Sequence, residues 1–153
     1  MMKMDLALIK KILKHREPFL FVDAIEDISA DAITASLKVS KENVFLKGHF
    51  PGDPVVPGIF LIEAMAQAAA FLAIYNLRKE QGGGLKNVEY DLFLSKVNSV
   101  KFKAKIIPPV TLRIKAKINP TQIENFYEAI GQVYVGEELK AVGSQVLYFK
   151  IKE

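Results

Sequence analysis

The sequence predicts an α+β protein in which a curved antiparallel sheet wraps around one long central helix. One helix-forming segment is apolar on nearly every face. Several other segments alternate apolar and polar residues, which is the period of half-buried strands. Short turns join the later segments, as in an antiparallel sheet with one covered face. The 153 residues contain no internal repeat or linker, so we expect a single domain over residues 1–153.

The first elements of this fold precede the central helix. The amphipathic start, MMKMDLALIKKILKHREP, predicts a helix that ends near Lys14. It lacks the apolar run and cleavage site of a signal peptide, so we expect a cytoplasmic protein. Pro18 breaks the pattern, and a strand is predicted over 19–28. A second strand is predicted over 33–39, where apolar and polar residues alternate.

The central helix is predicted over IFLIEAMAQAAAFLAIYNLRK, from Ile59 to Lys79, which is rich in the strong helix formers Ala, Leu and Met. Up to Tyr75 its strongly polar side chains are Glu63 and Gln67. A helix that is apolar nearly all round is buried, and an internal carboxylate makes this stretch a poor bilayer span. We therefore place it in the protein core and expect no membrane insertion.

The remainder of the chain is predicted to be strands. The glycines at 82–84 indicate a turn after the helix, and Pro108-Pro109 separates two alternating segments. Four strands are expected, near 100–106, 111–118, 122–135 and 138–151.

Composition excludes several kinds of site. The chain has no cysteine, so it has no disulfides and no thiolate metal ligands. Its two histidines do not form an HxxxH or HxxH pair, and we expect neither a metal nor a cofactor. The net charge of +4 comes from 21 basic and 17 acidic residues. So modest an excess indicates an acidic partner only where the basic residues cluster.

The most restricted stretch of the chain is GHFPGDPVVPG (48–58), which holds three prolines, three glycines and His49. Proline fixes φ and glycine opens backbone positions closed to other residues, so this composition specifies one particular path. Such a path suits a loop that aims a side chain. The ordinary alternative is that His49 is a loop histidine bonded to a carbonyl group.

Glu63 is the second candidate for chemistry. An isolated charged carboxylate in a buried helix is unfavourable, so it is expected to become neutral or to find a partner. Gln67 lies one turn further along the same face. The structural alternative is that Glu63 lies at the mouth of the helix or caps a loop.

Together these parts suit one reaction. The first amides of the helix after Gly58 are unpaired and carry the positive end of its dipole. A loop that folds back, within one subunit or across a dimer seam, would join His49, Glu63 and these amides. Removal of a proton next to a thioester carbonyl needs a base, the developing enolate needs fixed donors, and departure of a β-hydroxyl needs an acid. Base, donors and acid make a dehydratase.

The segment GHFPGDPVVPGIFLIEAMAQ (48–67) closely resembles the signature of the β-hydroxyacyl-acyl-carrier-protein dehydratases of fatty-acid synthesis. HREPFLFVD (15–23) is similar to the other landmark of that family, and VGEELKAVGSQVL (135–147) to its closing strand. The resemblance covers essentially the whole chain. It implies the hot-dog fold, a homodimer with two active sites at its seam, and further assembly as a trimer of dimers.

The resemblance also implies roles for four residues. His49 is the expected catalytic histidine and Glu63 the catalytic acid, the two coming from opposite subunits. Gly58 is expected to offer its N–H to the thioester carbonyl, and Gln67 to orient Glu63. The implied reaction converts a (3R)-hydroxyacyl group on acyl carrier protein into a trans-2-enoyl group, without cofactor or metal. Glutamate in the helix, rather than aspartate, favours the short dehydratase branch over the dehydratase-isomerases.

Three positions depart from the family pattern. Glu17 stands where tyrosine is usual, Ala24 where arginine is usual, and Pro108-Pro109-Val110 where a Pro-Gly-Asp turn is expected. All lie outside the catalytic motif, so they bear on acyl-chain length and carrier docking. A divergent dehydratase of a polyketide or pigment pathway is one alternative, and a hot-dog acyl thioesterase is another. A scaffolding subunit without turnover is disfavoured, because His49 and Glu63 are both present.

Acyl carrier proteins are acidic, so the resemblance favours a basic surface on this chain. Basic residues alternate with apolar ones on two consecutive predicted strands, and we expect most of them on one solvent face. The candidates for carrier docking are Lys101, Lys103, Lys105, Arg113 and Lys115. The alternative is a solvated face whose lysines prevent edge pairing. Nucleic acid is disfavoured because the aromatic residues here are expected to face inward.

Overall fold

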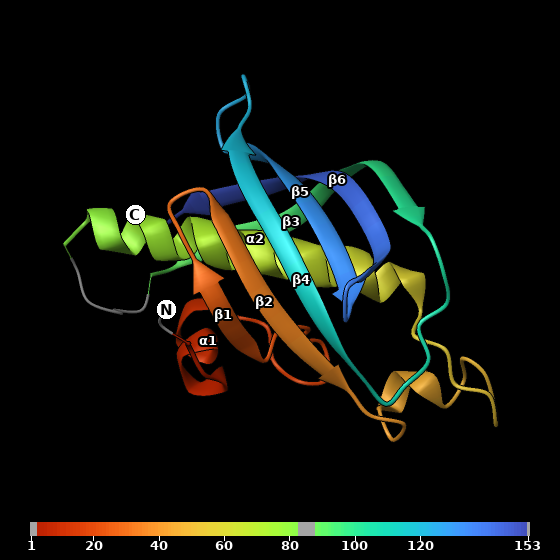
Figure 1. Ribbon diagram of the computed structural model, residues 1–153. Coiled ribbons are helices and arrows are strands. Elements are labelled where there is room, and N and C mark those ends of the chain that lie inside the picture. Colours follow the sequence, from red (N-terminus) through yellow and green to blue (C-terminus); the bar gives the residue numbers. More distant parts are fainter. Residues whose placement is uncertain (1–2, 83–87, 153) are drawn as a thin grey trace.

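The structure, a computed structural model, describes residues 3–82 and 88–152. Within these residues six antiparallel strands form one sheet in the order β1-β2-β4-β5-β6-β3. The sheet curves around the long helix α2, which lies along its concave face (Figure 1). The predicted fold class, an antiparallel sheet wrapped around a central helix, is confirmed.

The chain begins with the short helix α1 (Leu6–Ile12). Asp5 caps it, because its carboxylate accepts a hydrogen bond of 3.0 Å from the backbone N–H of Leu8. The helix ends two residues before the predicted Lys14, since Leu13 already has an extended backbone. A segment without regular structure then leads to β1 (Ala24–Ile28).

The prediction of a strand over 19–28 is wrong in its first half, because β1 starts at Ala24. The backbone groups of Phe19 and Phe21 are bonded to a side chain of α2 rather than to a neighbouring strand. The carbonyl of Phe19 accepts from the Gln67 amide at 2.9 Å, and the N–H of Phe21 donates to it at 2.8 Å. This long-range contact overrides the local apolar pattern.

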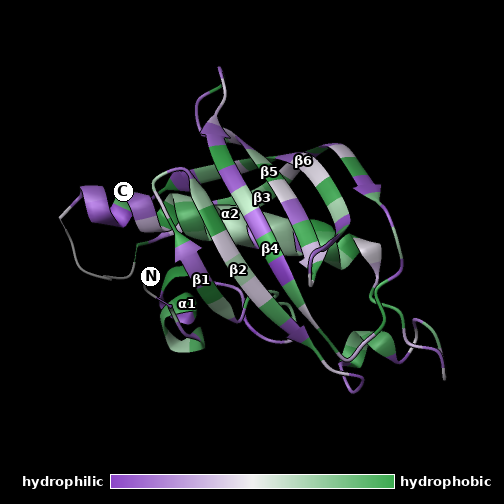
Figure 2. Ribbon diagram, in the orientation of Figure 1, coloured by the Kyte–Doolittle hydropathy of each residue, from purple (hydrophilic) through white to green (hydrophobic). Residues whose placement is uncertain are grey.

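Helix α2 (Gly58–Glu80) matches the predicted segment to within one residue at each end. Residues 64–72 are all buried, and the helix packs mainly on β4 and β5. It is long and apolar enough to cross a membrane by length and composition, but 61% of the most apolar window is buried inside the protein. Apolar colours run along most of α2, and polar residues gather at its C-terminal end (Figure 2).

The strands after β1 are mostly as predicted. Their bounds are β2 (Ala32–Val39), β3 (Tyr90–Phe102), β4 (Val110–Pro120), β5 (Phe126–Val135) and β6 (Glu138–Ile151), with a short 3-10 helix, η1, at Val44–Leu46. β5 starts four residues late because the chain turns at Asn125, which has a left-handed φ of 67°. β3 starts ten residues earlier than predicted. Of the predicted glycine turn, Gly82 has a φ of 60° and the rest lies outside the described residues.

Two glycines allow close packing around Met65 of α2 and Val100 of β3. Gly131 of β5 and Gly143 of β6 are paired across the strands, below the side chain of Met65. A Cβ on Gly131 would lie 2.7 Å from Met65 Cγ, and one on Gly143 would lie 2.9 Å from Val100 Cγ2. Both distances are shorter than real Cβ contacts, so glycine is required at 131 where α2 packs on the sheet, and at 143 where β6 packs against Val100 of β3.

Candidate active site

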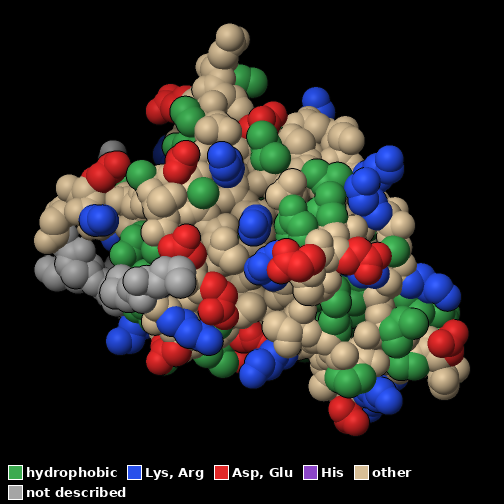
Figure 3. All heavy atoms as spheres, viewed as in Figure 1, with side chains coloured by type: hydrophobic (Ala, Val, Ile, Leu, Met, Phe, Trp, Pro, Cys, Tyr) green, Lys and Arg blue, Asp and Glu red, His purple; other side chains and the backbone are tan. Residues whose placement is uncertain are grey.

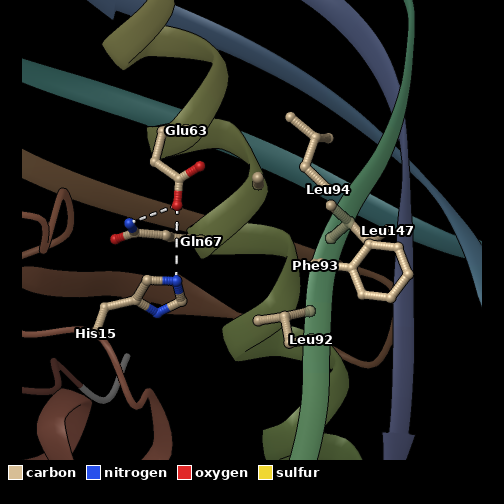
Figure 4. Close-up of a pocket in the computed structure, with 8 residues that line it drawn as sticks. His15, Glu63, Gln67, Leu92, Phe93, Leu94 and Leu147 are labelled. Atoms are coloured by element: carbon tan, nitrogen blue, oxygen red, sulfur yellow. Dashed lines mark hydrogen bonds and ion pairs between the residues drawn. The ribbon is translucent and has the colours of Figure 1, made fainter.

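A cavity of about 200 Å³ opens beside the first half of α2. Two successive turns of the helix bring Glu63 and Gln67 to it, and His15 reaches it from the segment between α1 and β1 (Figure 4). The rest of the wall is Ala66 and the apolar side chains of Leu92, Phe93, Leu94 and Leu147, from β3 and β6. The cavity is therefore a small polar cluster facing an apolar wall.

The side chain of Gln67 is held in one orientation by three hydrogen bonds. Its side chain is buried, its Oε1 accepts from the N–H of Phe21, and its Nε2 donates to the carbonyl of Phe19. The same Nε2 donates to Glu63 Oε1 at 2.8 Å. The two backbone contacts set the amide orientation, so the N–H that faces Glu63 is fixed. This is the geometry expected of a residue that orients Glu63.

Glu63 is only 20% exposed. Burial raises the pKa of its carboxyl group, and the hydrogen bond from Gln67 opposes that rise without cancelling it. The side chain caps no loop, because it lies in the second turn of α2 and points into the cavity (Figure 4). It can therefore hold a proton at a pH where an exposed glutamate has lost it.

His15 is a site residue that the sequence reasoning missed. Its Nε2 lies 3.6 Å from Glu63 Oε1, and its side chain is 22% exposed. Burial lowers the pKa of His15, and the neighbouring charge of Arg16 lowers it further. The available signal was its position as the first residue of HREPFLFVD, the second segment that carries the family resemblance.

His49 lies in the loop before α2, where its Nδ1 is 2.7 Å from the carbonyl oxygen of Val55. The backbone of this loop is held by hydrogen bonds from Val55 N–H to His49 O and between Phe50 and Asp53. Because Nδ1 faces an acceptor, neutral His49 carries its proton there and keeps the Nε2 lone pair free. The hydrogen bond of His49 to a carbonyl group is thus compatible with a role for His49 as the base.

Gly58 opens α2, and no side chain caps the helix at Pro57. A Cβ on Gly58 would lie 3.1 Å from the ring of Phe102, so the position is crowded. The N–H of Phe60 bonds the carbonyl of Pro57, so the donor site at the start of the helix consists of the N–H groups of Gly58 and Ile59. His49 does not line the cavity that holds Glu63. A single chain therefore joins Glu63 with Gln67, but not with His49.

The predicted placement of the carrier-docking residues is partly wrong. Lys103 and Lys105 lie beyond the end of β3 at Phe102, and β5 and β6 separate β3 from β4 in the sheet. Lys101 and Lys115 do share one row across the sheet, paired through Val142 and Gln132. They are about 14 Å apart, three strand spacings.

Arg113 contacts the turn between β5 and β6, with Glu137 at 3.9 Å and the carbonyl of Gly136 at 3.4 Å. Over the sheet face seen in Figure 3, basic side chains are mixed with acidic ones rather than gathered in one field. The docking role of these residues stays a prediction.

A family model described as the FabA-like domain matches residues 13–142. The chain belongs to this family. A 3-hydroxyacyl-[acyl-carrier-protein] dehydratase FabZ from Clostridium perfringens is 39% identical over 115 residues, covering 75% of this chain and 77% of that one. A FabZ dehydratase from Rhizorhabdus wittichii is 34% identical over 139 residues, covering 90% of this chain and 84% of that one. The family resemblance of the sequence motifs is confirmed.

Other relatives are longer or more distant. A bifunctional LpxC/FabZ enzyme from Porphyromonas gingivalis is 35% identical over 89% of this chain, which spans only 28% of that relative. Among solved structures, the dehydratase heterocomplex ApeI:P from Xenorhabdus doucetiae has a TM-score of 0.74 at 22% identity, covering 92% of this chain and 89% of that one. A mutant thioesterase PA1618 from Pseudomonas aeruginosa has a TM-score of 0.67 at 10% sequence identity, covering 97% of this chain and 96% of that one. These likenesses confirm the hot-dog fold.

Proposed function

We propose that the chain removes water from a (3R)-hydroxyacyl group on acyl carrier protein, giving a trans-2-enoyl thioester for fatty-acid synthesis. The observation that carries this proposal is a buried glutamate, Glu63, held at the edge of an apolar cavity by Gln67. A carboxyl group with a raised pKa is what a general acid requires at neutral pH. Membership of the FabA-like family supports the same chemistry.

In this mechanism the free Nε2 of His49 takes a proton from the carbon next to the thioester carbonyl. The N–H of Gly58 stabilises the negative charge that develops on the carbonyl oxygen. Glu63 gives its proton to the β-hydroxyl as the carbon–oxygen bond breaks, so one water leaves and a double bond forms. The proton held by His49 then returns to Glu63 through solvent, and the site is reset.

We further propose a homodimer in which His49 of a second copy completes the site at Glu63. β3 is an edge strand within the described sheet, and its 13 residues are mostly exposed. Phe93, Leu94 and Val97 are between 41% and 53% exposed along it. A long exposed apolar edge strand is suited to pairing with another chain. Phe93 and Leu94 also line the cavity, so pairing at β3 would close the site.

A mass-resolved assay tests the activity. Acyl carrier protein loaded with a β-hydroxyacyl group is incubated with the parent chain and with Glu63→Gln. We expect the parent to produce a loss of one water with the thioester intact, and the variant to produce almost none. Release of free carrier thiol would instead assign the chain to the thioesterases. No product across several acyl-chain lengths would contradict the proposed function.

A further inference from the structure

His15 contacts Glu63 but has no part in the mechanism above. We propose that His15 is a positioning residue whose Nε2–H, with the amide of Gln67, holds Oε1 of Glu63 and stabilises the carboxylate left after Glu63 has given up its proton. The proposal rests on the proposed function only in naming Glu63 as the acid. It predicts that the strength of this acid depends on a donor contributed by the segment between α1 and β1.

The two oxygens of Glu63 lie in different surroundings. Oε1 accepts from Gln67 at 2.8 Å and has His15 at 3.6 Å. The other oxygen is turned away from the His15 ring and toward the side of Leu94 (Figure 4). In a neutral carboxylic acid the carbonyl oxygen is the stronger acceptor, so we assign that role to Oε1. The acid proton therefore lies on Oε2, the oxygen that faces the cavity.

The surroundings of His15 define which nitrogen carries its proton. Nδ1 is buried and has no hydrogen-bond partner among residues 3–82 and 88–152. A cationic ring would bury an N–H donor there without an acceptor, which is unfavourable. A neutral ring protonated on Nδ1 would do the same and would aim a lone pair at Oε1. The neutral form protonated on Nε2 avoids both penalties and presents its N–H to Glu63.

Charged neighbours do not replace this donor. The cavity walls from β3 and β6 are apolar. Arg16 is the charged neighbour that acts on His15, and its guanidinium bonds carbonyl groups of the preceding segment. Those acceptors are Lys10, Leu13 and His15. Once Glu63 ionises, the N–H groups of Gln67 and His15 are therefore the donors positioned at Oε1.

The length of the contact fits this role. At 3.6 Å the two atoms are close but not hydrogen-bonded, so the proposed bond is one that closes as Glu63 ionises. Hydrogen bonds to a carboxylate are shorter and stronger than those to a neutral acid. The interaction therefore strengthens as the proton leaves Glu63, and an interaction stronger in the transition state than in the ground state accelerates the reaction.

Two substitutions distinguish a role for His15 as a hydrogen-bond donor from a role in packing alone. His15→Phe keeps a ring and removes the N–H, whereas His15→Gln keeps an amide N–H in reach of Oε1 and cannot titrate. The protonated-carboxyl band of Glu63 is followed by infrared spectroscopy against pH without substrate, and is assigned by its loss in Glu63→Gln. We expect His15→Phe to raise the midpoint by about one pH unit. We expect His15→Gln to keep the parental midpoint.

Turnover gives the second readout. We expect kcat to fall about tenfold in His15→Phe, equivalent to about 1.4 kcal/mol, with little change in KM, and to stay near the parental value in His15→Gln. An unshifted midpoint in His15→Phe, or equal shifts in both variants, would overturn the proposal. If His15→Phe does not fold, His15→Leu supplies the same comparison. A shifted midpoint in a chain without dehydratase activity would contradict the proposed function alone, because the infrared readout needs no substrate.

Discussion

The amide Nε2 of Gln67 donates a hydrogen bond to Glu63 Oε1 across one turn of α2, at 2.8 Å. The same amide is tied to the backbone of Phe19 and Phe21, so it links the carboxyl group to the segment in front of β1. A single buried side chain thus determines both the path of that segment and the orientation of the proposed acid.

Substitution Gln67→Leu should impair both stability and catalysis. It leaves the buried N–H of Phe21 without its partner, and such a loss destabilises by about 1–3 kcal/mol. It also frees Glu63 to rotate, so kcat should fall by at least about tenfold. Urea unfolding and steady-state kinetics measure the two effects. Parental stability in the variant would show that the backbone bonds to Gln67 contribute little.

The stability of the parent chain should depend on pH through Glu63. Burial raises the folded pKa of Glu63 above its unfolded value, so the folded chain keeps a proton that the unfolded chain has lost. This contribution is fully present below the unfolded pKa and is lost as pH rises through the folded pKa. The variant Glu63→Gln has no titrating carboxyl group, so it does not lose this stability as pH rises, and its side-chain oxygen can still accept from Gln67.

Thermal unfolding should therefore show Glu63→Gln gaining stability over the parent as pH rises from about 4 to 7. The gain is a difference between two curves, so other titrating groups cancel. A gap that stays constant across this range would contradict a raised pKa at Glu63.

Much of this fold follows from local sequence. α2 was predicted to within one residue, because its apolar pattern is continuous and it follows a Pro-Gly pair. The first half of the 19–28 segment was not, because Gln67 lies more than 45 residues away and captures its backbone. The order of the strands in the sheet was not predicted, because alternation places β3 in a sheet but does not indicate which strand it pairs with.

Part of the candidate site was likewise predictable from the sequence, and part was not. The sequence motif predicted Glu63, Gln67 and His49 as site residues, and the structure brings the first two together at the cavity. It did not reveal the contact between His15 and Glu63, which depends on how the segment after α1 crosses α2. The surface prediction was wrong in placing Lys103 and Lys105 on a strand, because β3 ends at Phe102.

Gly131→Ala should destabilise the protein without touching the site chemistry. The added Cβ would lie 2.7 Å from Met65 Cγ and Sδ, so Met65 or the helix must move. Overpacking of this kind destabilises by about 1–3 kcal/mol. Gly136→Ala is a useful contrast, since its Cβ meets nothing within 4 Å and its left-handed φ of 57° is the only source of strain. Equal melting temperatures for Gly131→Ala and the parent would show that the helix adjusts freely.

Carrier recognition should depend on Lys101 and Lys115, which are exposed in one row of the sheet. Reversing both charges should raise KM for the acidic carrier-bound substrate about three- to tenfold at low salt, with less effect at high salt. A short thioester analogue without the carrier should be unaffected. Lys79→Glu, at the C-terminal end of α2, is the control for each single reversal, Lys101→Glu and Lys115→Glu, because all three change the net charge equally. Equal effects of the control and the single reversals would argue against this docking row.

The central claim is that one active site uses Glu63 of one chain and His49 of another. The most direct test mixes the inactive variants His49→Ala and Glu63→Gln under conditions of demonstrated subunit exchange. Half of the dimers are then mixed and each regains one intact site, so the account predicts about a quarter of the parental rate. Mixing Glu63→Gln with the double variant, which has no intact Glu63, should give none. Absence of rescue in the first mixture would contradict the shared site.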